Sequence, residues 1–193
     1  MNRFISQFGR PAGAFGRMLG RVMTISNRKM HRAVMSELGS FSELLEIGFG
    51  TGSQLEMISR SFPEARLSGI DISEDMLKAA GKRLGIRAEL FLCSCESTAF
   101  ADSRFDAVIT TDTCYFWKDA QAVLAEVSRI TKPEGRLIIA YNSIYAGSVH
   151  KSEGTAMYND QTIAAELDKA GMKLISKRSC GYKQTVFVIR NRK

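Results

Sequence analysis

The feature that most constrains the fold is a short apolar segment that runs directly into a glycine-rich turn. Residues 44–47 read Leu-Leu-Glu-Ile, and residues 48–52 read Gly-Phe-Gly-Thr-Gly. Glycine allows the backbone to adopt a positive φ and to approach a ligand closely. Open α/β sheets bind ligands at the carboxyl ends of their strands, where such a turn would lie. The segment therefore predicts a buried strand, a ligand-binding turn and a short helix over residues 53–60.

From residue 41 onward, short apolar segments alternate with amphipathic ones, which is typical of a doubly wound α/β sheet. Ser73 has the type and position of a helix N-cap. The last two apolar segments are too close in sequence for a parallel crossover, so they must pair antiparallel. The predicted sheet therefore has seven strands, mostly parallel, with an antiparallel C-terminal hairpin. Further helices are expected over residues 73–84, 120–130 and 160–170, and the strands over 44–47, 67–71, 88–92, 105–110, 136–141, 173–179 and 184–190.

The length of 193 residues fits one domain with a buried core. We predict an N-terminal helical extension over residues 1–40, helical after Pro11, and a ligand-binding domain over residues 41–193. A long connection over residues 142–158 follows the fifth predicted strand, and loops of this length are usually functional.

Charge is distributed unevenly along the chain, whose net charge is +7. Residues 1–40 carry seven Lys or Arg and one Glu, and residues 158–193 carry eight basic and three acidic residues. The middle, residues 41–157, has sixteen acidic and twelve basic residues. Two basic ends indicate attraction to an anionic substrate, an RNA or a membrane surface, or simply solvated faces that keep the protein soluble.

Composition argues against several classes of site. The four cysteines include no pair with the two-residue gap of a zinc ribbon or a redox site, and only two histidines occur. We therefore expect no metal and a reduced, cytoplasmic setting. No apolar run approaches the roughly 20 residues of a membrane helix, so no transmembrane segment is expected.

The spacing of the glycines discriminates between nucleotide ligands. A dinucleotide fingerprint is Gly-x-Gly-x-x-Gly, whereas here the third glycine comes one residue early and Ser53 follows it. Glu46 would also place a carboxylate beside a pyrophosphate. A cationic ligand without phosphate, such as S-adenosylmethionine (SAM), meets no such repulsion. Asp71, about 20 residues beyond the glycines, suits the ribose of either kind of ligand.

Four ordered blocks resemble the class I SAM-dependent methyltransferases, in particular the ubiquinone/menaquinone-biosynthesis-like branch with a methyltransferase domain of type 11/25. They are LLEIGFGTG, GIDISEDMLKAA, SRFDAV at residues 103–108 and LAEVSRITKPEGRL at residues 124–137. In the last block, Glu134 stands where the family usually has glycine. The resemblance covers residues 42–190 and implies a Rossmann-like fold with an N-terminal extension that closes over the cofactor.

The resemblance also implies a set of site residues. The glycines would line the methionine side of SAM, Asp71 would hold the ribose, and Ile72 would pack against adenine. Ser94 stands where the family often has an Asp that accepts from the adenine amino group, and Cys95 could supply its backbone N–H instead. The implied cofactor-binding residues are Glu46, Gly48, Phe49, Gly50, Gly52, Asp71, Ile72, Met76, Ser94, Cys95, Glu96 and Thr111.

Candidates for catalysis are weaker. Asp112 would face the acceptor after the fourth strand, and His150 in the long connection is a candidate general base or an exposed loop histidine. Tyr115, with the two aromatic residues that follow it, would form an acceptor wall or pack beneath the sheet edge. No proline precedes Cys114, so a nucleophilic cysteine like that of cytosine-C5 methyltransferases is disfavoured.

These features predict an enzyme that transfers the methyl group of SAM to a small molecule by in-line displacement and releases S-adenosylhomocysteine (SAH). The alternative is an RNA or protein methyltransferase that uses the basic termini for binding. A nicotinamide oxidoreductase or a non-enzymatic binding module fits the glycine spacing less well. The sequence leaves the acceptor atom and the oligomeric state open.

Overall fold

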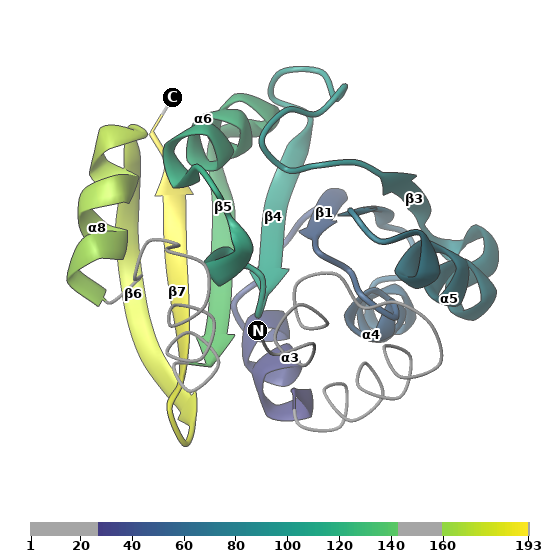
Figure 1. Cartoon of the computed structure of the whole chain (residues 1–193). Coiled ribbons are helices and arrows are strands. Elements are labelled where there is room, and N and C mark those ends of the chain that lie inside the picture. The colour runs from purple at the N-terminus through teal and green to yellow at the C-terminus, as the bar shows by residue number, and fades with distance from the viewer. Residues whose placement is uncertain (1–26, 143–159, 193) are drawn as a thin grey trace, which may run out of the picture.

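The computed structural model describes residues 27–142 and 160–192, apart from the side chains of Tyr115, residues 160–162 and Ala164. Within these residues, seven strands form one sheet in the order β3-β2-β1-β4-β5-β7-β6 (Figure 1). Strands from β3 to β5 pair in parallel, whereas β7 is antiparallel to both β5 and β6. The predicted sheet with its antiparallel C-terminal hairpin is confirmed. The strands are β1 (Glu43–Ile47), β2 (Arg66–Asp71), β3 (Glu89–Leu92), β4 (Phe105–Thr111), β5 (Thr131–Asn142), β6 (Met172–Gly181) and β7 (Gln184–Asn191).

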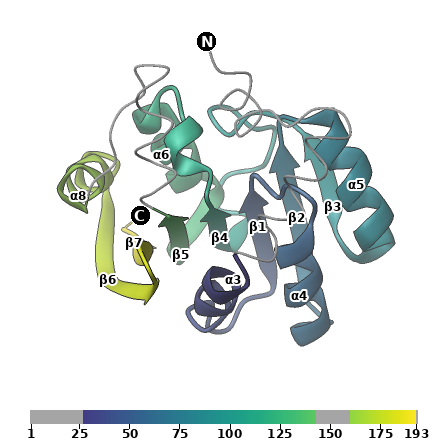
Figure 2. The same cartoon turned by 60° about the horizontal axis from the view of Figure 1, so that its bottom comes forward.

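Helices cover both faces of the sheet, as Figure 2 shows. Buried side chains of α3, α4 and α5 form one apolar cluster with the strands, and those of α6 and α8 belong to a second cluster on the other face. Two apolar clusters separated by a sheet are the expected result of double winding. The helices are α3 (Arg28–Met35), α4 (Ser53–Ser61), α5 (Glu74–Leu84), α6 (Ala120–Ile130) and α8 (Asp160–Lys169), with short 3₁₀ helices η1 (Gly85–Arg87) and η2 (Cys114–Phe116).

Helix α3 belongs to the same core as the sheet. It packs against β4, β5, β6 and β7, and the side chains of Met30 and Val34 are fully buried. Arg178 of β6 ties the helix down, because its guanidinium donates to the carbonyl oxygen of Ala33. The predicted helicity between Pro11 and residue 26 lies outside the described residues.

Strand β5 begins at Thr131, five residues before the predicted start at Arg136. Thr131 pairs with Phe105 and Arg136 with Ala107, so the residues between them form a bulge in β5. Glu134 lies in this bulge with φ of 61°, a left-handed conformation that glycine adopts most easily. The bulge explains why the family usually has glycine at this position. It also explains why the strand start was predicted too late, since Pro133 and Gly135 usually indicate a turn.

The N-cap predicted at Ser73 is present. Its side-chain oxygen accepts a hydrogen bond from the backbone N–H of Met76, with the donor and acceptor 3.4 Å apart. Acidic residues in the first turn of α5 favour the same helix start through the helix dipole. The cap places the beginning of α5 directly after the last residue of β2.

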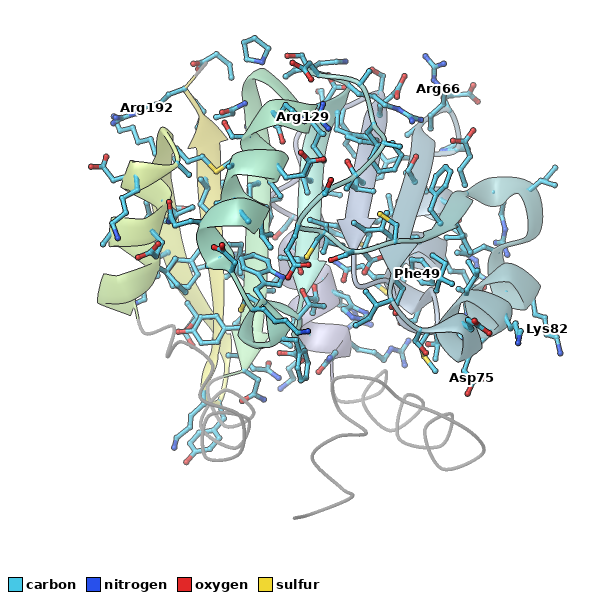
Figure 3. All side chains as sticks on the ribbon, turned by 45° about the horizontal axis from the view of Figure 1, so that its top comes forward. Phe49, Arg66, Asp75, Lys82, Arg129 and Arg192 are labelled. Carbon is cyan, nitrogen blue, oxygen red and sulfur yellow. The ribbon has the colours of Figure 1, made fainter. Side chains whose placement is uncertain are left out.

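The segment after β3 is attached to α6 by Glu126. One carboxylate oxygen accepts from the backbone N–H of Thr98 at 2.7 Å, and the other accepts from Nε of Arg129 at 2.8 Å. These bonds to the charged form, chiefly that from Arg129, lower the pKa of Glu126 to about 2. In Figure 3, Arg129 lies on the α6 side of the sheet, away from Asp75 and Lys82 near α5.

We expect Glu126→Gln to lower the free energy of unfolding by about 1–2 kcal/mol at pH 7, because hydrogen bonds to a charged acceptor are lost. A carboxyl whose folded pKa is lowered stabilises the protein above its unfolded pKa, and this contribution is lost as pH falls through the folded value. The difference between wild type and variant should therefore shrink between about pH 4.5 and pH 2. Urea unfolding across this range tests it, with Glu134→Gln as the control because the ion pair of Glu134 with Arg190 is exposed. A difference that does not change with pH would contradict the assignment.

Candidate functional site

A cavity of about 480 Å³ opens at the carboxyl ends of β1, β2 and β4. At this point the strand order of the sheet reverses, with β2 on one side of β1 and β4 on the other. Open α/β sheets bind ligands at such a point. Asp112 also lines the cavity. The side chain of Tyr115 and all of His150 lie outside the described residues. Of the predicted cofactor-binding residues, the cavity brings together Glu46, Gly48, Phe49, Gly50, Asp71, Ile72, Met76, Ser94, Cys95, Glu96 and Thr111.

Gly52 does not line the cavity, and its conformation has a different cause. It precedes α4 with φ of 75°, and a Cβ there would lie 2.9 Å from Cδ1 of Leu84 and 3.0 Å from Cβ of Ala80. Gly52 therefore allows α4 and α5 to approach each other. The third glycine of the turn serves helix packing in this structure.

The glycine turn is held by the backbone and by one carboxylate. The N–H of Gly48 donates to the carbonyl oxygen of Ile70 at 2.8 Å. One carboxylate oxygen of Asp71 accepts from the N–H of Gly50, and the other accepts from the N–H of Ser73, both at 2.9 Å. Asp71 thus links the turn after β1 to the start of α5, while burial raises the pKa of its carboxyl.

Glu46 is a buried carboxyl group without a cationic partner among the described residues. Glu46 is 3% exposed, and the Oε2 atom of its side chain makes no hydrogen bond within the described part of the chain. Burial, followed by the negative charge of Asp71, raises the pKa of Glu46 well above its usual value. Two buried acids beside a glycine turn form a site that a cation brought by a ligand would stabilise.

Other buried polar atoms also lack partners in the described residues and face this cavity. They are Oδ1 of Asn27, Nδ1 of His31 and Nε2 of Gln54. Gln54 accepts at Oε1 from the hydroxyl of Thr111 at 2.8 Å, so its amide N–H groups remain available. Buried polar groups in folded proteins are nearly always hydrogen-bonded, and exceptions that gather at one cavity indicate a ligand.

These three residues were not predicted from the sequence. Gln54 follows the glycine turn directly, so its position beside the ligand could have been found from the turn. Asn27 and His31 precede β1 by more than ten residues, and no motif marks them. Only the packing of α3 beside β4 brings them to the cavity.

The loop after β3 forms another wall of the cavity. The hydroxyl of Ser94 is hydrogen-bonded to a carboxylate oxygen of Glu96, so an acid stands close to the position where the family often has Asp. Burial, and then the charge of Glu96, raises the pKa of the Cys95 thiol to about 12, which keeps it protonated and unreactive.

Aromatic side chains close the opposite end, after β4. Phe116 and Trp117 both line the cavity, and Trp117 also belongs to the apolar core. A role of this aromatic segment as an acceptor wall stays a prediction. Cys114 is buried in that core and does not line the cavity, which agrees with a packing role.

Two structural features bear on other functions. Among residues 27–142 and 160–192, no three His, Cys, Asp or Glu side chains are grouped so that they could hold a metal ion. None of the described helices has the length and apolar character needed to span a membrane.

Comparison with known proteins points to one family. The family described as "Methyltransferase domain" matches residues 45–139. Ubiquinone/menaquinone biosynthesis C-methyltransferase UbiE of Desulfotalea psychrophila is 34% identical over 125 residues, which cover 63% of this chain and 51% of that protein. Uncharacterized methyltransferase YdaC of Bacillus subtilis is 29% identical over 150 residues, 75% of this chain and 81% of its own length. The chain thus spans about half of the UbiE relative and most of YdaC.

Solved structures share the fold at low sequence identity. The methyltransferase in a complex with the Trm112 methyltransferase activator of Haloferax volcanii superposes with a TM-score of 0.86 at 15% identity, covering 100% of this chain and 99% of that one. A SAM-dependent methyltransferase from Aquifex aeolicus gives 0.72 at 18% identity, covering 86% and 93%. The strand order, the glycine turn after β1 and the sequence matches agree, and together they support a class I SAM-dependent methyltransferase.

Proposed function

We propose that this chain transfers the methyl group of SAM to a small-molecule acceptor by in-line displacement. The observation that carries the proposal is the pair of buried acids, Glu46 and Asp71, at a glycine turn with no cation paired to Glu46 in the described residues. SAM is cationic at its sulfonium and its amino group and carries no phosphate, so it suits an acidic cavity.

Each wall of the cavity has a proposed task. Glu46 would bind the ammonium group of the cofactor, and the free amide N–H groups of Gln54 would donate to its carboxylate. Asp71 would accept from the ribose hydroxyls. The Ser94–Glu96 pair would accept from the adenine amino group, which replaces the Asp that the family often has there.

When bound, SAM supplies a methyl group on a sulfonium, a good leaving group, so the protein's own contribution is mainly orientation and exclusion of water. The turn after β1 fixes the cofactor end, while the segment after β4 and helix α3 surround the space in front of it. Holding two reactants in line in this way supplies several kcal/mol of the barrier reduction in oriented reactions.

Charge pairing favours a small acceptor over RNA. In the basic C-terminal region, Arg178 is paired with Glu37 at 2.7 Å and Arg190 with Glu134 at 3.2 Å. Neutralised cations contribute little to phosphate binding. The names of relatives, such as UbiE and malonyl-[acyl-carrier protein] O-methyltransferase of Hahella chejuensis, also suggest metabolic acceptors. The cytoplasmic location expected from the sequence stays a prediction.

Transfer of labelled methyl from SAM in a cell extract, followed by ultrafiltration, tests the proposal. After separation from unreacted SAM, label is expected on another compound in the filtrate, since a small-molecule product passes the membrane. Label retained with RNA or protein would favour the alternative acceptor class. No transfer that depends on the added protein would contradict methyl transfer itself.

We expect Asp71→Asn to weaken SAM binding by about 2 kcal/mol, roughly 30-fold, because an amide group cannot accept from two N–H groups and from the ribose as a carboxylate does. Its NH₂ group would face the N–H of Gly50 or of Ser73, which now donate to Asp71. Calorimetric titration with SAM measures the effect. Glu74→Gln is a matched control because it removes an exposed acid three residues away. Equal SAM affinity in wild type and Asp71→Asn would show that the ribose site is elsewhere.

A further inference from the structure

Helix α3 brings two polar side chains into the cavity that the proposed cofactor contacts do not use. Asn27 and His31 are each 6% exposed and line the cavity. They are four residues apart, and the N–H of His31 donates to the carbonyl oxygen of Asn27 at 2.8 Å, so their side chains lie on the same face of the helix.

The orientation of Asn27 is set by Asp112. The amide nitrogen of Asn27 donates to Oδ2 of Asp112 at 2.8 Å, and Oδ1 of Asp112 accepts from the backbone N–H of Asn142 at 2.9 Å. Asp112 is itself held in place, because its N–H donates to the carbonyl oxygen of Ala140 at 2.9 Å. Asn27 therefore presents its carbonyl oxygen, an acceptor, as the unused atom.

His31 complements that acceptor. Burial lowers its pKa to about 4, so the imidazole is neutral at neutral pH and carries one N–H and one lone pair. The Nδ1 atom of His31 is buried and has no hydrogen-bond partner among the described residues. The two side chains together offer at least one acceptor and one donor.

Their place in the fold separates them from the proposed cofactor contacts. The ribose and adenine contacts come from β2 and from the loop after β3, which lie on one side of β1 in the sheet. Asn27 is hydrogen-bonded to Asp112, which follows β4 on the other side of β1, and helix α3 packs beside β4. Phe116 and Trp117 also follow β4 and line the cavity. This half of the cavity combines an apolar, aromatic wall with a small polar end.

We propose that Asn27 and His31 form the acceptor subsite and recognise a hydroxyl group on an uncharged, aromatic molecule. The inference rests on the proposed function for its meaning, but the binding it describes is testable without methyl transfer. A hydroxyl group is both donor and acceptor, so it can donate to Oδ1 of Asn27 and accept from the N–H of His31. A carboxylate would set its lone pairs against Oδ1 of Asn27 and its charge near Asp112, so it is disfavoured.

The test uses three probes with one shared body: 4-methylphenol, toluene and 4-methylbenzoate. The full-length protein is labelled with ¹⁵N-histidine, and each probe is titrated with and without SAH. The chain has two histidines, so His150→Gln assigns the His31 signal without altering α3. We expect 4-methylphenol to shift the His31 ring nitrogens saturably and to bind about tenfold more tightly than toluene or 4-methylbenzoate.

The variant Asn27→Ala provides the second part of the test. It should weaken 4-methylphenol binding about tenfold while leaving SAH affinity unchanged, whereas Lys29→Ala, on the exposed face of α3, should change neither. An unmoved His31 signal, or tighter binding of 4-methylbenzoate, would overturn the proposal. Failure of SAH to bind would instead remove the proposed cofactor, and the probe titrations of the free protein would still decide the acceptor subsite.

Discussion

Glu46→Gln is expected to weaken SAM binding by about 3 kcal/mol, roughly 100-fold, and to stabilise the protein without ligand. The loss follows from removing the carboxylate proposed to pair with the ammonium group of SAM. The gain follows because Glu46 is buried, with Oε2 unpartnered in the described residues and its pKa raised well above normal. A neutral amide avoids that desolvation, so function and stability should change in opposite directions.

The stabilisation expected from Glu46→Gln depends on pH in a defined way. A carboxyl whose folded pKa is raised binds more protons in the folded state, so its presence destabilises the protein increasingly as pH rises above the unfolded value near 4.5. The advantage of Glu46→Gln should thus be absent below that pH and grow toward neutrality. Urea unfolding and SAM titration at several pH values measure both effects, with the exposed Glu89→Gln as the control. A variant that binds SAM like wild type would contradict the proposed ammonium site.

Gly48→Ala is expected to destabilise the protein by about 3 kcal/mol or more and to abolish measurable SAM binding. Gly48 has φ of 73°, which costs an L-residue energy, and its added Cβ would lie 2.2 Å from Cγ2 of Thr113. Thr113 cannot rotate away freely, because its hydroxyl is hydrogen-bonded to that of Thr110. Backbone strain and steric overlap therefore act together at the turn.

Two further variants separate these causes. Gly50 has φ of 52°, but no atom of the described residues lies within 4 Å of the Cβ that Gly50→Ala would add, so this variant should cost only about 1 kcal/mol of stability. Thr113→Ser deletes the overlapping methyl group and keeps the hydroxyl, so combining it with Gly48→Ala should recover the steric part of the loss. Urea unfolding of the four proteins measures this. Equal destabilisation by Gly48→Ala and Gly50→Ala would show that the overlap with Thr113 is relieved by other means.

Much of the fold could be predicted because each element is marked locally. Alternation of apolar segments, the glycine turn after β1 and the cap at Ser73 are properties of neighbouring residues. The first five residues of β5 were missed because Pro133 and Gly135 normally indicate a turn, whereas here they form a bulge within the strand. Local signals cannot distinguish these cases, since the pairing with β4 decides between them.

The residues of the candidate site also fall into two groups, those that local sequence signals predicted and those that only tertiary packing brings to the cavity. Residues next to strand ends, such as Glu46, Asp71 and Glu96, were expected at the cavity and line it. Asn27 and His31 reach it only because α3 packs its apolar side, including Met30, against the distant strands. Gly52 was expected at the cavity and does not line it. It belongs to the ligand-binding motif, but glycine is required there by the contact between α4 and α5.

A crystal structure of the full-length protein with SAH bound tests the central claim most directly. SAH is expected in the cavity between the glycine turn and helix α3. Its amino-acid end should contact Glu46 and Gln54, and its ribose hydroxyls should donate to Asp71. SAH bound outside this cavity, or bound inside it with the ribose away from Asp71, would contradict the assignment of the site.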